Sequence, residues 1–146
     1  MAETYYADFR DYIDCLDKRG KLHRWRRPVN KDTEMMPLMR LQYRGIADEE
    51  RKVFLFENVY DSRGKKHDIR VATGMYGSSR PVAALGLGCE EPLAIYEKWR
   101  RALAQPIDPR MVSEAPVQEV VYTGERLGAF GVTSLPAPRG FGTATW

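Results

Sequence analysis

The sequence is poor in the residues from which catalytic and metal centres are built. Its 146 residues include two histidines and two cysteines. Cys15 and Cys89 lie far apart, and no HxxxH, CxxC or HExxH spacing occurs, so neither a metal site nor a redox pair is predicted. His23 belongs to a basic segment, and His67 follows two lysines in a turn that we expect to be exposed to solvent. With no nucleophile placed beside a base, the sequence predicts no catalytic, cofactor-binding or metal-binding residue in this chain.

Long apolar runs and a strong net charge are also absent. No apolar segment approaches the roughly 20 residues that a membrane-spanning helix requires, and residues 1–10 are too polar for a secretory signal. Two isolated cysteines without such a signal favour a reducing cytoplasm. The net charge of +3 is too small to indicate a polyanionic partner. We therefore expect a cytoplasmic protein that binds neither nucleic acid nor membranes.

What the sequence does contain is the pattern of an α+β domain. Residues 5–19 carry an apolar stripe at helical spacing, with Thr4 as the expected cap and Gly20 as the expected terminator. A short strand at 22–25 should end at Pro28. The dense apolar run at 53–59 predicts a buried central strand, and 69–73 should be its returning strand. Further helices are expected over residues 32–45, 81–86 and 91–105.

The last of these helices has its own apolar stripe. Ile95, Tyr96, Trp99 and Leu103 keep helical spacing, and we expect the two aromatic side chains to pack in the core together with those of the central strand. Residues 1–110 are thus predicted to form one domain, a small mixed sheet with flanking helices.

Two segments are candidates for binding an anion. The first is a basic strip over residues 18–27, which is either a phosphate or nucleic-acid surface or, as we favour, a solvated helix end and edge strand. The second is the loop that carries Gly77, Ser78, Ser79 and Arg80, between an expected strand and an expected helix. Its backbone N–H groups and Arg80 could receive an anion. Alternatively, the glycines serve the turn and Arg80 pairs with a local carboxylate, which is the interpretation we favour.

Residues 111–146 are expected to be a linker, a strand and a tail. The segment 119–123 resembles the opening strand of a new domain, and such a strand needs neighbours for its backbone N–H and C=O groups. About twenty further residues cannot build a second core. The sequence therefore predicts that this region docks on a partner, or that more chain belongs with it. The expected docking residues are apolar: Val120, Tyr122, Leu127, Phe130, Val132, Leu135 and Trp146.

Four sequence segments, taken in order, resemble the N-terminal domain of the UbiD family of prenylated-flavin-dependent carboxy-lyases. The first runs from Asp8-Phe9-Arg10-Asp11-Tyr12-Ile13 through Gly20-Lys21-Leu22 to Pro28-Val29-Asn30. The others are Leu55-Phe56-Glu57-Asn58-Val59, Tyr76-Gly77-Ser78-Ser79-Arg80 and Pro116-Val117-Gln118-Glu119-Val120-Val121-Tyr122-Thr123-Gly124. The last resembles the passage into that family's flavin-binding domain. After Glu125 the sequence departs from the family pattern, which puts the fold of the tail in question.

The resemblance implies a function that this chain would share with a partner. Family members are longer, and a split-barrel domain beyond the region covered here holds prenylated FMN with Mn and K ions. The glutamate–arginine–glutamate set that performs the chemistry also lies beyond it. The resemblance therefore implies a non-catalytic subunit or N-terminal part of a decarboxylase or carboxylase for aromatic or α,β-unsaturated acids. Its partner would be a larger catalytic chain in a hetero-oligomer. The alternative is a free-standing binding or regulatory module for an anionic ligand, and a third reading, an autonomous enzyme, lacks the necessary residues.

Overall fold

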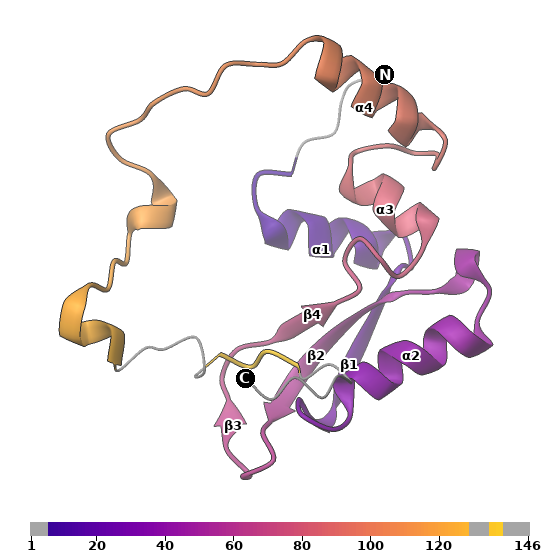
Figure 1. Ribbon diagram of the computed structural model, residues 1–146. Helices are drawn as coiled ribbons and strands as arrows, with labels where there is room; N and C mark the ends of the chain where they lie inside the picture. The colour runs from indigo at the N-terminus through magenta and orange to yellow at the C-terminus, as the bar shows by residue number, and fades with distance from the viewer. Residues whose placement is uncertain (1–5, 129–134, 139–146) are drawn as a thin grey trace.

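The computed structural model describes residues 6–128 and 135–138, and Figure 1 shows the order of its elements. Four α-helices form: α1 (Phe9–Lys18), α2 (Met35–Gly45), α3 (Arg80–Gly86) and α4 (Ala94–Ala104). Four strands form the sheet: β1 (Leu22–Asn30), β2 (Val53–Tyr60), β3 (Lys66–His67) and β4 (Val71–Thr73). The described residues also contain short 3₁₀ helices: η1 (Asp48–Glu50), η2 (Pro116–Gln118) and η3 (Gly124–Gly128). The expected α+β class is confirmed.

The sheet is mixed, and β2 is its central strand. β1 pairs parallel to β2, with Leu22 opposite Val53, whereas β3 and β4 both pair antiparallel to it. A parallel pair needs a crossover connection, and α2 supplies it. The dense apolar run that predicted a buried central strand is therefore confirmed.

Two clusters of buried side chains lie on opposite faces of this sheet. Leu55 packs with residues of α1 and α3, whereas its neighbour Phe56 packs with Met35 of α2. Because successive strand residues point to opposite faces, α1 and α3 cover one face and α2 covers the other. Figure 1 shows the same arrangement, with α1 and α3 on one side of the strands and α2 on the other.

The first helix and the first strand differ from expectation at their ends. Asp8 caps α1, because its side chain accepts hydrogen bonds from the backbone N–H groups of Arg10 and Asp11; Thr4 lies outside the described residues. Gly20 ends the helix with φ of +66°, as predicted. β1 does not stop at Pro28 but runs through it, since β1 is an edge strand and its register shifts between Trp25 and Pro28. A proline is tolerated at an edge or a bulge because no ladder hydrogen bond is lost there.

Three residues lie in the opposite environment to the one expected from the sequence, one buried instead of solvated and two exposed instead of in the core. His67 is buried with 8% of its surface exposed, because β3 pairs with β2 and sets it beside Val59. Its Nε2 atom has no hydrogen-bond partner among the described residues. Tyr96 and Trp99 are exposed instead of packing in the core, and α4 contains no buried residue. Both expectations were wrong, because each depended on a tertiary contact rather than on local spacing.

The strand expected over 119–123 does not form. This segment follows η2 without regular structure, and Val120, Val121 and Tyr122 are exposed. A strand requires a neighbour to satisfy its backbone groups, and the strand pairings of the described chain involve β1 to β4 alone. Pairing of this segment with a partner chain stays a prediction.

The stability of the fold depends on pH through the Asp32 carboxylate. One carboxylate oxygen accepts a hydrogen bond from Lys31 at 2.8 Å, and the other accepts from the backbone N–H and hydroxyl of Ser62 at 3.0 and 3.1 Å. The Lys31 hydrogen bond is the main reason that the pKa of Asp32 falls from 3.8 to about 2. Because the folded-state pKa is the lower one, this stabilisation is complete above the unfolded-state value and is lost as pH falls towards 2.

Replacing Asp32 with Asn should therefore remove about 2 kcal/mol of stability near neutral pH. The difference in unfolding free energy between wild type and Asp32→Asn should shrink between pH 4 and pH 2, as measured by urea unfolding. Lys31→Met should reproduce the larger part of this difference. A difference that stays constant down to pH 2 would show that the carboxylate charge is not the cause.

Candidate functional site

The loop before α3 is held by its own backbone and by two serines. Gly74 has φ of +80°, and its carbonyl oxygen accepts a hydrogen bond from the Ser78 N–H at 3.0 Å. The Ser79 hydroxyl caps α3 by accepting from the Val82 N–H at 3.3 Å. Ser78 is fully buried, and its Oγ has no hydrogen-bond partner among the described residues. The four residues predicted as an anion loop therefore run from the end of a turn at Gly77 into the first residue of α3, with Gly77 and Arg80 exposed.

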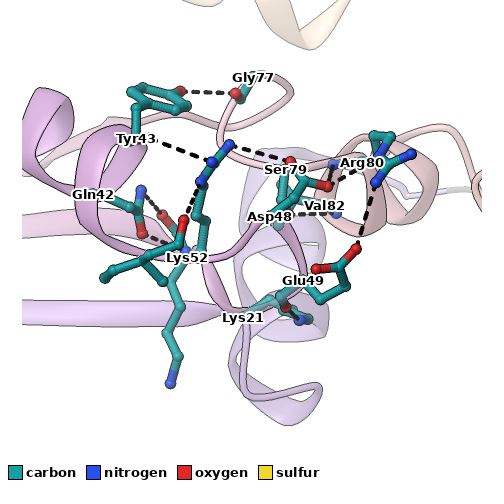
Figure 2. Close-up of polar contacts among 12 residues, drawn as sticks. Lys21, Gln42, Tyr43, Asp48, Glu49, Lys52, Gly77, Ser79, Arg80 and Val82 are labelled. Atoms are coloured by element: carbon teal, nitrogen blue, oxygen red, sulfur yellow. Dashed lines mark hydrogen bonds and ion pairs between the residues drawn. The ribbon is translucent and has the colours of Figure 1, made fainter.

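A carboxylate already lies where an anion would bind. The Arg80 backbone N–H and its Nε both donate to one oxygen of Asp48 at 3.1 Å, and Nη2 donates to Glu49 at 3.4 Å (Figure 2). Partial burial raises the pKa of Asp48, but the hydrogen bonds and charge of Arg80, together with the charge of Arg51, outweigh it and the net shift is downward. This is the pairing of Arg80 with a carboxylate of the same chain, which the sequence favoured over an anion site. An external anion would have to displace Asp48, so the geometry does not favour an anion site.

Neighbouring contacts tie α2 to this loop and to the segment that follows η1. Arg51 donates to another oxygen of Asp48 at 3.3 Å. Gln42 bonds both the N–H and the carbonyl of Lys52, at 2.6 and 2.9 Å, and Tyr43 donates to the Gly77 carbonyl at 2.7 Å. Figure 2 shows these contacts together, between α2 and the start of α3. These contacts hold α2, the loop before α3 and the start of β2 together, so the role of the cluster is structural.

Arg19 and Arg24 of the basic strip are paired with acidic residues of the domain. Arg19 forms two hydrogen bonds of 2.7 Å with Glu90, and Arg24 contacts Asp17 at 2.7 Å and Glu57 at 3.2 Å. The Arg19–Glu90 pair is exposed and the Arg24 pairs are partly buried, and pairs of the exposed kind are typical of a solvated charged surface. Among residues 6–128 and 135–138, no three histidine, cysteine or acidic side chains lie close enough to hold a metal ion. Nor is any helix of that part of the chain long and apolar enough to cross a membrane.

The exposed apolar surface is concentrated on α4 and the residues after it. We call Leu93, Tyr96, Trp99 and Leu103 the α4 face, and their exposed fractions run from 60% to 80%. Between this helix and α3 lies a concave pocket of about 760 Å³, lined by Pro81, Ala83 and Ile95 among others. Sequence reasoning missed this surface because helical spacing reveals an apolar stripe but not what covers it.

The residues predicted to dock on a partner are exposed where the structure describes them. Val120, Tyr122, Leu127 and Leu135 all lie at the surface, whereas Pro136 is buried. Phe130, Val132 and Trp146 lie outside the described residues. Exposure is what a docking segment requires in the free chain, but what binds there stays a prediction.

The fold and these surfaces define a small α+β domain whose outward apolar residues gather at its C-terminal helix. Residues 13–103 match the 3-octaprenyl-4-hydroxybenzoate carboxy-lyase N-terminal domain family, which is more than half of the 146 residues. The chain belongs to this family, so the expected resemblance is confirmed. The match runs from α1 into the last turn of α4.

Proposed function

We propose that this chain is a non-catalytic subunit, or the N-terminal part, of a UbiD-type carboxy-lyase. Its role is to support a flavin-binding catalytic chain that acts on aromatic or α,β-unsaturated carboxylic acids. The observation that carries the proposal is the family membership of residues 13–103. The exposed apolar residues of α4 and of 105–127 support it, because surface of this kind is normally covered by another protein surface.

The cofactor in this proposal belongs to the partner chain. Prenylated FMN with Mn and K would supply an electron sink for the reversible loss of CO₂. A Mn site needs several converging oxygen or nitrogen ligands, and the described residues of this chain bring no three such acidic, histidine or cysteine groups together. The contribution of this chain is then to dock on the flavin-binding chain and to shape access to its site.

The proposal is tested by removing residues 127–146. The truncated chain should no longer co-purify with the flavin-binding carboxy-lyase chain of the same organism, because it lacks Leu127, Leu135 and the rest of the predicted docking tail. Co-expression followed by size exclusion with light scattering measures the complex, and visible absorbance reports the flavin.

The control is the fold of the truncated chain itself. Because the strand pairs of the described residues lie between residues 22 and 73, its circular dichroism should match that of the full chain. A complex that survives the truncation unchanged would contradict docking by the tail. Failure of the full chain to bind would contradict the proposed function as a whole.

A further inference from the structure

The α4 face is a continuous apolar stripe on a helix that the domain does not cover. Tyr96, Trp99 and Leu103 follow each other at spacings of three and four, so they lie on one side of the helix. Ile95 and Pro92, which line the pocket beside α3, are half-buried, but no residue of α4 is buried. In Figure 1, α4 lies at the edge of the fold, beyond α3 and away from the sheet.

Leaving this face in water is costly. Isolated helices shorter than about 12–15 residues are marginal in water, and α4 has 11 residues. Aromatic side chains bury about 150–250 Å² each, so Tyr96 at 75% and Trp99 at 60% exposure present roughly 250 Å² between them. Leu93 and Leu103 extend the patch to the few hundred Å² that mark interaction sites. Tyr and Trp are also the residues that most often dominate binding energy.

The charges of α4 indicate the kind of surface that fits. The helix carries Lys98, Arg100 and Arg101 against one carboxylate, Glu97. Arg100 contacts Glu97 at 2.7 Å, on the flank of the stripe. Glu49 and Glu91 line the pocket beside Leu93 and Tyr96, so the edge of the α4 face carries charges of both signs. A complementary surface is therefore apolar in its centre and mixed in charge at its edge.

The position of α4 in the chain indicates where that surface belongs. α4 is the last helix of the family domain, and the exposed segment 105–127 continues directly from it. A surface tethered to, or bound by, that segment is held near α4 at high effective concentration. In the proposed function, the flavin-binding chain either continues from this segment or binds it.

We propose that the α4 face is the principal docking surface of this domain, and that it binds an apolar patch on the flavin-binding chain. This inference rests on the proposed function. It assigns the largest share of the binding energy to a helix of the folded domain, while the tail supplies a further contact without which the complex does not survive purification. Residues that sequence spacing had placed in the core become the centre of an interface.

The test compares two double variants that remove similar apolar surface. Trp99→Ala with Leu103→Ala truncates the α4 face, and because alanine has the highest helix propensity, the helix itself is not weakened. Leu41→Ala with Ile69→Ala is the matched control, since these side chains are 65% and 52% exposed on other parts of the domain. Titration calorimetry against the purified flavin-binding chain should show about tenfold or greater weakening for the first pair. The control should stay within about twofold.

A second readout separates docking from indirect effects. In the complex, hydrogen exchange at the α4 amides should slow relative to the free chain, because a covered helix opens less often. If loss of residues 127–146 abolishes binding but the α4 variant binds normally and its amides gain no protection, the inference is overturned while the proposed function stands. If the wild-type chain does not bind at all, both the inference and the proposed function are contradicted. If light scattering shows instead a self-associated chain that the α4 variant dissociates, a second copy is the occupant and the inference is overturned.

Discussion

Phe56→Ala is expected to lower the free energy of unfolding by about 3–5 kcal/mol. Phe56 is fully buried on the central strand β2, and it forms one cluster with Val29, Met35 and Val59. Its ring stacks on Phe54, with centroids 5.6 Å apart and planes 9° apart. Truncation leaves a cavity between the sheet and α2 that neighbouring side chains on rigid elements fill only in part. The loss is a large fraction of the roughly 5–15 kcal/mol that stabilises a typical domain.

Urea unfolding followed by circular dichroism measures this loss. Since about 1 kcal/mol shifts the midpoint of a domain of this size by roughly 4–8 °C, the variant should melt well over ten degrees lower or be unfolded at 37 °C. Phe9→Ala is the matched control, because Phe9 is 57% exposed and its truncation opens no cavity. A loss below about 1 kcal/mol for Phe56→Ala would mean that the cluster is not the core of this face.

Gly86→Ala is expected to destabilise the domain by about 1–3 kcal/mol through overpacking. A Cβ at this position would lie 2.7 Å from the Tyr12 hydroxyl oxygen and 2.5 Å from Cε1 of Tyr76. Tyr76 is exposed and has room to move, but the Tyr12 hydroxyl lies 2.6 Å from the Met75 carbonyl and 2.9 Å from that of Val82. Relieving the clash therefore displaces a buried group from its acceptors, which adds a desolvation cost.

Gly45→Ala provides the control for the backbone effect of the same substitution. Gly45 is the last residue of α2, and a Cβ there would meet no atom within 4 Å. Alanine favours a helix over glycine by up to about 1 kcal/mol, so this variant should be neutral or slightly more stable. Opposite signs for the two substitutions, measured by urea unfolding, are the expected result. Equal effects would show that packing around Tyr12 does not decide the outcome.

Local patterns predicted those elements of the fold whose neighbours are close in the sequence. The stripe of α1 places Tyr12, Ile13 and Leu16 in the core, and the dense run of β2 is the central strand. Gly20 and the proline at the start of α3 mark helix ends, as expected. In each case the signal is a property of a few consecutive residues, such as spacing, a cap or a left-handed glycine.

The expectations that failed each depended on contacts between distant residues. Whether β1 passes Pro28 depends on its being an edge strand, and whether His67 is buried depends on β3 pairing with β2. Spacing could not show whether the apolar stripe of α4 faces this domain or another surface. The sequence predicted that Arg80 pairs with a carboxylate, and it does. It could not predict that the carboxylate is Asp48, because the two residues are 32 positions apart and no local spacing connects them.

The distribution of strand pairs along the chain has a consequence for synthesis on the ribosome. β2 pairs with β3 and β4 over short separations, and the more distant parallel pair with β1 is completed by residue 60. Every partner strand of the sheet has therefore been made once residue 73 leaves the exit tunnel, and domains generally fold as units, N-terminal ones first. The sheet is then able to close before α4 emerges from the tunnel. A nascent chain arrested far enough beyond residue 104 for α4 to emerge would display a folded sheet with its flanking helices, and α4 would be the helix of the described residues that emerges last.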